Sequence, residues 1–308
     1  MEQNETVDPS FDHFPIADAL DHEILMHRDT HFGGLFSVML DYYAQEGKGI
    51  QPQITLDRIE KLDIMEKQVK QNLAAMFLLA EEMQKVADSR EAYRQLRSIY
   101  EINNPKNPHP KLIADLILCE DEDAEEEVAA IVKEKGSIVK LLMDLLRNEQ
   151  FHDALYPGYG LAPSLVVKCL GRIGDKRAII SLFEAIGEGD FFADDIILEA
   201  LKEIGEPAKE FLLRVVASQP INEDNEKAAI ALIAFKDEQV AEKAFELFKQ
   251  SDFQADPCLS TYLILACESL KNATDRAEFA ILAHQVNKTQ KLDMQVILQH
   301  WENEEDAL

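Results

Sequence analysis

The chain has 308 residues and a formal net charge of −27 at pH 7, with 46% hydrophobic and 29% charged residues. This composition is typical of an ordered globular protein and excludes a disordered one. Acidic residues exceed basic ones in both halves of the chain, so the electrostatic field repels phosphate backbones and anionic membranes. We expect no direct binding of nucleic acid or membranes and a preference for basic partners. The same charge has a simpler interpretation, which is that it keeps the protein soluble.

The cysteines and the apolar segments indicate the compartment. Cys119, Cys169, Cys258 and Cys267 show no CxxC spacing and lie in apolar helical contexts, so we expect buried free thiols in a reducing compartment. No apolar core follows a basic start, and no uncharged apolar run approaches the roughly 20 residues that span a bilayer. The sequence therefore predicts a cytoplasmic protein.

The first third of the chain predicts a polar segment over residues 1–30 and a helical domain over 31–104. Apolar residues share one helix face over 35–43, and Gly47-Lys48-Gly49 ends that helix. A long amphipathic stretch covers 54–87, and a further helix covers 89–102. The apolar stripe of the long stretch predicts a seam between helices and comprises Leu62, Met65, Val69, Met76, Ala80 and Met83.

Three prolines within residues 105–110 break the helical pattern and predict the domain boundary. A short helix is expected over 112–119, and the acidic run 120–127 leads into another helix over 125–134. We interpret the acidic run as a solvated helix start, because carboxylates complement the positive end of the helix dipole. The alternative is a site for a metal or a basic partner.

Beyond residue 160 the sequence is periodic at a spacing of 31 residues. Each copy carries apolar residues at i, i+3, i+4 and i+7, then a polar turn and a second helix. The matching positions are Val166, Ile197 and Ala228; Cys169, Ala200 and Ala231; Leu170, Leu201 and Leu232; Ile173, Ile204 and Phe235; and, at the turns, Gly174, Gly205 and Lys236. A looser fourth copy covers about 262–281, a final helix covers 290–301, and an incomplete copy covers 125–147.

The run Cys169-Leu170-Gly171-Arg172-Ile173-Gly174-Asp175-Lys176-Arg177-Ala178-Ile179 resembles the HEAT-like repeats of phycobilisome lyases. The resemblance covers about residues 125–300 and implies an α-α superhelix over 110–308. It implies no single function, because such repeats occur in scaffolds, transport factors, lyases and hydroxylases. Residues 1–110 resemble no family that we can name. We therefore expect an all-α protein in which an N-terminal helical domain precedes a HEAT-repeat solenoid.

The histidines near the N-terminus are the candidates for metal binding. His27 and His31 are four residues apart and share a helix face, and His22 and Glu23 form a His-Glu dipeptide. Deoxyhypusine hydroxylase is similar in being a HEAT-like protein that binds iron through such dipeptides. There the dipeptides recur on several repeats, whereas this chain has one, outside the repeats. We therefore predict no metal, no cofactor and no catalytic residue.

The insertion at residues 151–160 interrupts the repeat pattern and predicts a binding segment. Tyr156 and Tyr159, flanked by Pro and Gly, offer a rigid amphipathic surface. The alternative is a plug over the apolar end where the two domains meet. Phe32 is either an exposed anchor or part of a helix start docked on the core. With Asp194 and Asp195, these aromatic residues are the partner-binding candidates.

The leading hypothesis is a non-enzymatic scaffold that binds a basic protein along the concave face of an acidic helical solenoid. The alternative is a metal-dependent enzyme, hydroxylase- or lyase-like, that uses His22, Glu23, His27 and His31. A third hypothesis is that the acidic surface imitates DNA. The sequence does not identify the partner or the oligomeric state.

Overall fold

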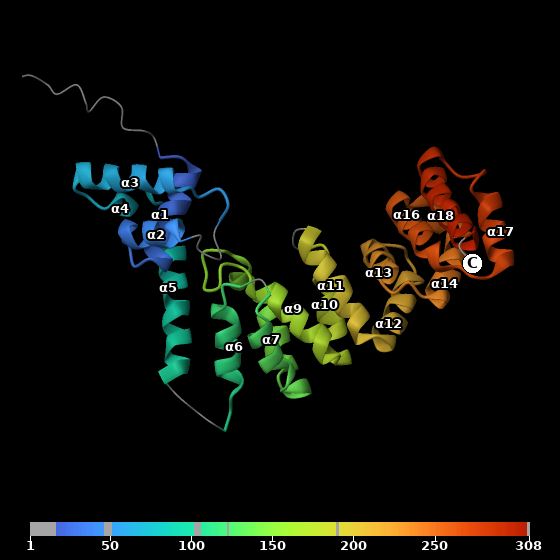
Figure 1. Ribbon diagram of the computed structural model, residues 1–308, viewed down its shortest axis with the longest axis horizontal. Coiled ribbons are helices and arrows are strands. Elements are labelled where there is room, and N and C mark those ends of the chain that lie inside the picture. Colours follow the sequence, from blue (N-terminus) through green and yellow to red (C-terminus); the bar gives the residue numbers. More distant parts are fainter. Residues whose placement is uncertain (1–16, 46–50, 102–105, 122, 189–190, 307–308) are drawn as a thin grey trace, which may run out of the picture. The chain divides into compact units, whose positions relative to one another are not determined.

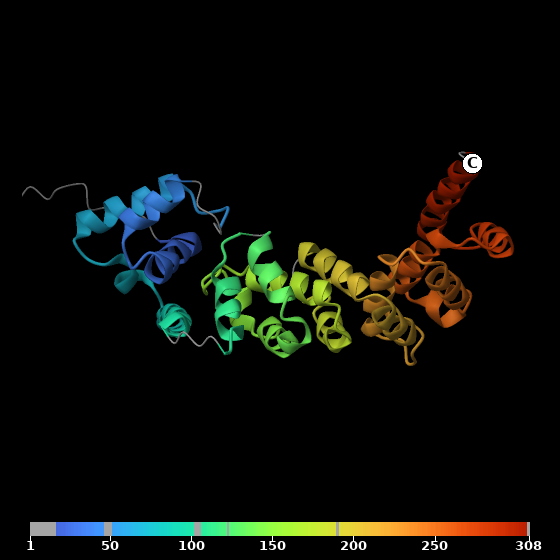
Figure 2. The same cartoon turned by 60° about the horizontal axis from the view of Figure 1, so that its bottom comes forward.

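The computed structural model describes residues 17–45, 51–101, 106–121, 123–188 and 191–306, and these residues form helices and connecting turns without any strand. The all-α expectation is therefore confirmed for the described part of the chain (Figures 1 and 2). None of the helices in these ranges combines the length and apolarity that crossing a membrane requires. Gly47-Lys48-Gly49, expected as a helix end, lies outside the described residues.

The chain forms two compact units, and their division differs from the predicted boundary near residue 105. Unit 1 comprises residues 1–124 and 148–162, and unit 2 comprises residues 125–147 and 163–308. The prolines at 105–110 separate two helices of the same unit. The insertion after residue 147 belongs to unit 1, although the sequence on both sides of it belongs to unit 2.

The prediction of a polar segment over residues 1–30 is wrong for its second half, because all but the last residue of the first helix of unit 1 lie inside that segment. The helices of unit 1 are α1 (Ala19–His31), α2 (Phe36–Ala44), α3 (Leu56–Val69), α4 (Leu73–Phe77), α5 (Ala80–Glu101), α6 (His109–Leu118) and the 3-10 turn η3 (Glu149–His152). Asp18 caps α1, and Asp21 completes a capping box. Ile24 and Leu25 are fully buried in a core shared with α2, α3 and α4.

The long seam predicted over 54–87 is interrupted. Lys70 adopts a left-handed conformation that ends α3, and the Asn72 side chain caps α4 by accepting a hydrogen bond from the Ala75 amide. Leu62 is buried as predicted, whereas Met76 and Met83 are 46% and 47% exposed. The turn rotates the later positions away from the core, because a helical stripe keeps its direction only along an unbroken helix.

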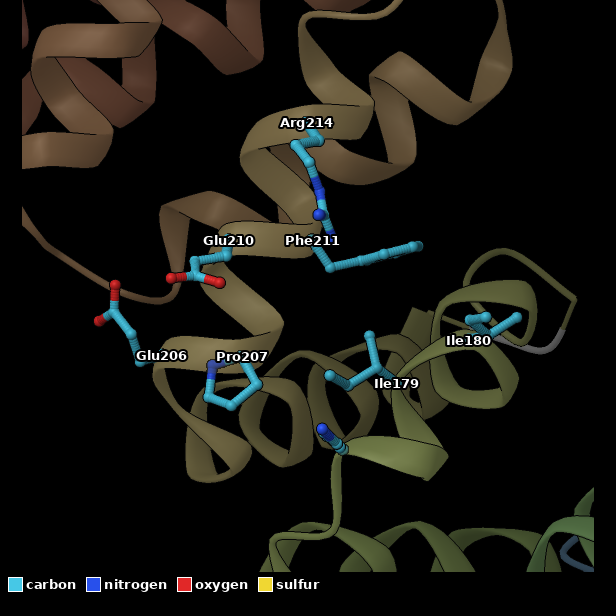
Figure 3. A pocket seen from close by; sticks show the side chains of 8 residues that line it. Ile179, Ile180, Glu206, Pro207, Glu210, Phe211 and Arg214 are labelled. Atoms are coloured by element: carbon cyan, nitrogen blue, oxygen red, sulfur yellow. The ribbon is translucent and has the colours of Figure 1, made fainter.

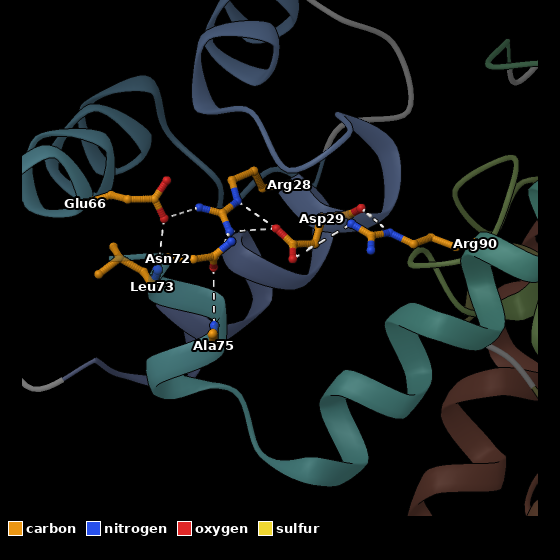
Figure 4. A network of polar contacts seen from close by, with 7 residues as sticks. All are labelled: Arg28, Asp29, Glu66, Asn72, Leu73, Ala75 and Arg90. Atoms are coloured by element: carbon orange, nitrogen blue, oxygen red, sulfur yellow. Dashed lines mark hydrogen bonds and ion pairs between the residues drawn. The ribbon is translucent and has the colours of Figure 1, made fainter. Parts of the chain in front are cut away.

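A fully buried arginine connects α1 to α3 and α4 (Figure 4). Arg28 donates hydrogen bonds to Asp29, Glu66 and Asn72 at 2.8, 2.6 and 3.1 Å. The guanidinium also lies 4.5 Å from the centre of the Phe36 ring. Two carboxylates and an amide oxygen thus compensate the charge, which would otherwise be costly to bury.

Unit 2 contains the periodic sequence. Its elements are α7 (Glu125–Val132), η2 (Lys135–Ser137), α8 (Val139–Leu146), α9 (Ala162–Ile173), η4 (Lys176–Ala178), α10 (Ile179–Glu184), α11 (Phe191–Ile204), α12 (Glu206–Val216), α13 (Glu223–Ile233), α14 (Glu238–Phe248), α15 (Ser251–Ala255), α16 (Pro257–Ala266), η5 (Cys267–Ser269), α17 (Ala273–Leu282) and α18 (Lys288–Asp306). The predicted first and second helices of each copy match α9 and α10, α11 and α12, and α13 and α14.

The matched positions of the three copies have matched environments. All nine residues of the first three aligned sets, which begin at Val166, Cys169 and Leu170, are buried. The turn residues Gly174, Gly205 and Lys236 all have positive φ, at 68°, 80° and 46°. The repeat therefore recurs in the positive φ of this position as well as in burial, with a lysine where the first two copies have glycine.

From α10 to α13, the helices of unit 2 pack on their neighbours in the chain, and α13 and α14 also pack on the later helix α16. α10 packs on α11, α11 on α12, α12 on α13, and α13 on α14 and α16. Buried Asn225 connects two of them, because its Nδ2 lies within 3.1 Å of the carbonyl oxygens of Val215, Val216 and Ser218 at the end of α12. Its Oδ1 accepts a hydrogen bond from the Asn222 amide at the start of α13.

The final helix α18 packs on α16 and α17, and its Trp301 side chain contacts η5 and α17. Its indole Nε1 donates to the Glu268 carbonyl at 2.7 Å, and the ring lies 5.2 Å from that of Phe279. Cys169 and Cys267 are buried free thiols as expected, whereas Cys258 is exposed.

Candidate functional site

A surface groove in unit 2 lies between successive second helices, α10 with its leading turn η4 on one side and α12 on the other. Its volume is about 410 Å³, at the lower end of the range for ligand pockets. Figure 3 shows Phe211 of α12 extending across the opening toward Ile179 and Ile180 of α10. The lining residues are Lys176, Ile179, Ile180, Glu206, Pro207, Glu210, Phe211 and Arg214.

The apolar part of the groove is held in place from behind. The Phe211 ring packs edge-on against the buried Phe183 ring, with their centres 5.4 Å apart. Ile180 is 54% exposed, whereas its neighbour Ile179 is buried. The groove thus presents aliphatic and aromatic surface on two helices, next to the buried side chains of Ile179 and Phe183.

This groove was not predicted from the sequence, although one apolar residue of its lining departs from the helical pattern. The inward face of α10 contains the buried residues Ile179, Leu182 and Phe183, and Ile180 falls outside that face. A single exposed apolar residue is common on protein surfaces, so Ile180 alone could not indicate a groove. Phe211 is half-buried at the groove.

In unit 1 the predicted metal candidates His27 and His31 lie in an aromatic cluster. The rings of His27 and His31 stack 5.2 Å apart, and His31 stacks on Tyr159 at 4.4 Å. His31 Nδ1 is 2.7 Å from the Tyr93 hydroxyl, and His31 Nε2 is 3.3 Å from the Ala154 carbonyl oxygen. Burial lowers the pKa of His27 to about 4 and that of His31 to about 3, so both are neutral near pH 7.

His22 and Glu23, the other metal candidates, do not join these histidines. His22 Nδ1 is 3.0 Å from both carboxylate oxygens of Glu82, and the Glu23 carboxylate contacts Gln53 at 3.5 Å. Both ring nitrogens of His31 are therefore engaged by neighbouring groups, whereas the contact of His22 involves Nδ1 alone. Within the described ranges, a group of three residues that could supply ligand atoms to a metal lies elsewhere, in unit 2. It comprises Glu226, Asp256 and Cys258, whose ligand atoms all lie within 4.8 Å of one another.

The partner-binding candidates occupy different environments. Phe32 and Tyr156 are buried, and half-buried Tyr159 is covered by the His31 ring. The insertion also packs on α5, where the Ser89 hydroxyl donates to the Leu155 carbonyl at 2.7 Å. The burial of these rings favours a packing role within unit 1. Half-buried Asp194 accepts a hydrogen bond from the Gly187 amide, and Asp195 is exposed.

Comparisons with known proteins assign no family to the chain. A scan against protein-family models finds no match, and a search of curated proteins finds no similar sequence. The resemblance to HEAT-like repeats therefore depends on the periodic residues themselves and on how unit 2 arranges them.

Proposed function

We propose that the protein is a non-enzymatic scaffold that binds another protein through unit 2. The observation that carries this proposal is the groove between α10 and α12, where apolar side chains open to the surface between two successive repeats. Apolar surface of this kind, rimmed by charged residues, is typical of protein-binding sites.

The proposal includes an α-α superhelix of the HEAT-like type. The positive φ that recurs at Gly174, Gly205 and Lys236 and the chain-order packing of the helices from α10 to α13 support it. In such a stack each pair buries its apolar face against the next, and a small rotation at every step produces a continuous curved face. The second helices α10, α12, α14 and α17 would form that face, with the groove on it.

The net charge of −27 adds long-range attraction for a partner with a basic surface. Such attraction accelerates encounter and weakens as salt screens it, with a Debye length of about 8 Å at physiological ionic strength. A partner that uses this field must therefore bind more weakly at high salt.

Affinity capture from a native lysate tests the proposal with three forms of the full chain, namely wild type, Ile180→Asp and Leu35→Asp. Leu35 is a matched control, because it is 56% exposed against 54% for Ile180 and lies in unit 1. We expect a protein that the wild type and Leu35→Asp retain and Ile180→Asp loses.

The captured protein is then titrated in purified form at low and high salt. We expect the affinity for wild type to fall at least about tenfold as the salt rises. Equal retention by all three forms, or an affinity that salt does not change, would contradict the proposal.

A further inference from the structure

Building on the proposed function, we infer that the groove between α10 and α12 accepts an apolar side chain of the partner with a carboxylate beside it. Arg214 is the group that pairs with that carboxylate. The groove therefore selects an acidic group of the partner, whereas the net charge of the whole protein attracts a basic surface.

The charged residues on the elements around the groove are mostly paired already. Glu206 forms an ion pair with Lys209 at 2.9 Å, Asp175 with Arg177 at 2.6 Å, and Glu184 with Arg147 at 3.1 Å. These pairs neutralise one another locally and offer little to a ligand.

Three lining charges remain, Lys176, Arg214 and Glu210, and within the described part of the chain none of them forms a hydrogen bond or ion pair. Figure 3 shows the Arg214 side chain extending toward Phe211, whereas the Glu210 carboxylate points away from the two isoleucines. The unpaired charge beside the apolar surface is therefore cationic, and the unpaired lining charges are two cations and one carboxylate.

Distance decides which charges matter to a seated ligand. Charges farther than about 8 Å are largely screened at physiological ionic strength, so the total of −27 acts mainly during approach. A side chain held against Ile180 and Phe211 is affected by the nearest groups instead. An arginine fork also matches a carboxylate in geometry, which an isolated lysine does not.

The apolar contact and the ionic contact support each other. A partner residue that covers Ile180 and Phe211 removes water from their surface, and the same displacement strengthens the ion pair beside them. The groove therefore accommodates a short segment with a leucine- or phenylalanine-like anchor followed by an acidic residue.

Three designed fluorescent peptides test this inference. They share one length and one pattern of leucines, and they carry Glu, Gln or Lys at the flanking positions. Fluorescence anisotropy at about 0.15 M salt, where the Debye length is about 8 Å, measures their binding to the full chain and to Ile180→Asp, Arg214→Gln and Arg214→Glu. Unchanged circular dichroism and Trp301 emission serve as the folding control for each variant.

The binding that is lost in Ile180→Asp is the binding at the groove. For this part of the binding, we expect the wild type to bind the Glu peptide about tenfold more tightly than the Lys peptide. Arg214→Gln should remove this preference and Arg214→Glu should reverse it. Binding that depends on Ile180 but not on peptide charge would overturn the inference and leave the proposed function standing. Peptide binding that never depends on Ile180 would overturn the assignment of the groove itself.

Discussion

The recurring turn of unit 2 allows a graded prediction at one structural position in three repeats. Gly174, Gly205 and Lys236 have φ of 68°, 80° and 46°, and a side chain at positive φ costs roughly 1–2 kcal/mol. Lys236→Gly removes that cost but gives the unfolded chain extra freedom, worth about 0.4–1 kcal/mol. We expect a net gain of about 0.5–1 kcal/mol in the free energy of unfolding.

The two glycines should respond in the opposite direction and unequally. A Cβ at Gly205 would meet no atom within 4 Å, so any loss comes from the backbone. Its ψ of −137° lies outside the left-handed helical region, and we expect Gly205→Ala to cost about 2–3 kcal/mol. A Cβ at Gly174 would also find space, and Gly174→Ala should cost about 1 kcal/mol.

Urea denaturation followed by tryptophan fluorescence measures these changes in unit 2 specifically. Trp301 is the one tryptophan in the chain, its ring is buried, and unfolding exposes it to water. Destabilisation by Lys236→Gly, or equal losses for Gly174→Ala and Gly205→Ala, would refute the energies assigned to these backbone conformations.

Three further predictions concern buried polar groups. Because the folded pKa of His27 and of His31 lies below the usual 6.5, at about 4 and about 3, the unfolded chain binds more protons between these values. The stability that unit 1 gains from keeping these histidines neutral is complete above about pH 6.5, and a few kcal/mol of it are lost as the pH falls toward 3. Thermal melts followed by tyrosine near-ultraviolet circular dichroism measure this loss, and a melting temperature that is independent of pH would contradict it. Asn225→Ala should cost about 2–4 kcal/mol in urea, and Asn225→Asp more, because a carboxylate would face the carbonyl oxygens of α12; tolerance of Asp would exclude the donor role. Arg28→Met should lower the free energy of unfolding by about 3–5 kcal/mol. Glu66→Gln should lower it less, because Asp29 still pairs with Arg28. Thermal melts that rank the two variants in the opposite order would show that Glu66 is the main counter-ion.

The repeats could be predicted because their signal is local and recurs. Burial at Leu170, Leu201 and Leu232 and the turns that follow them come from one apolar pattern, which the 31-residue spacing repeats. Lys236 was aligned with two glycines by that spacing alone, and its positive φ agrees with the alignment.

Unit 1 and the groove were harder to predict, because their determinants lie far apart in the sequence. Arg28 makes α1 look polar, yet it is buried by Glu66 and Asn72, which lie 38 and 44 residues away. The insertion with Tyr159 reads as a loop until its contact with His31 is known. Ile180 becomes part of a groove only when α12 of the next repeat stands opposite, which the pattern within α10 cannot indicate.

Site-specific photo-crosslinking tests the central claim, that a partner protein binds at the second helices of unit 2. A photoreactive amino acid replaces Ile180 in one form of the full chain and Leu35 in another, two positions of nearly equal exposure at 54% and 56%. Both are illuminated in native lysate, and crosslinked proteins are identified by mass spectrometry. We expect one protein to be crosslinked from position 180 and not from position 35, with a yield that falls as the salt concentration rises. Identical products from both positions, or none from position 180, would contradict it.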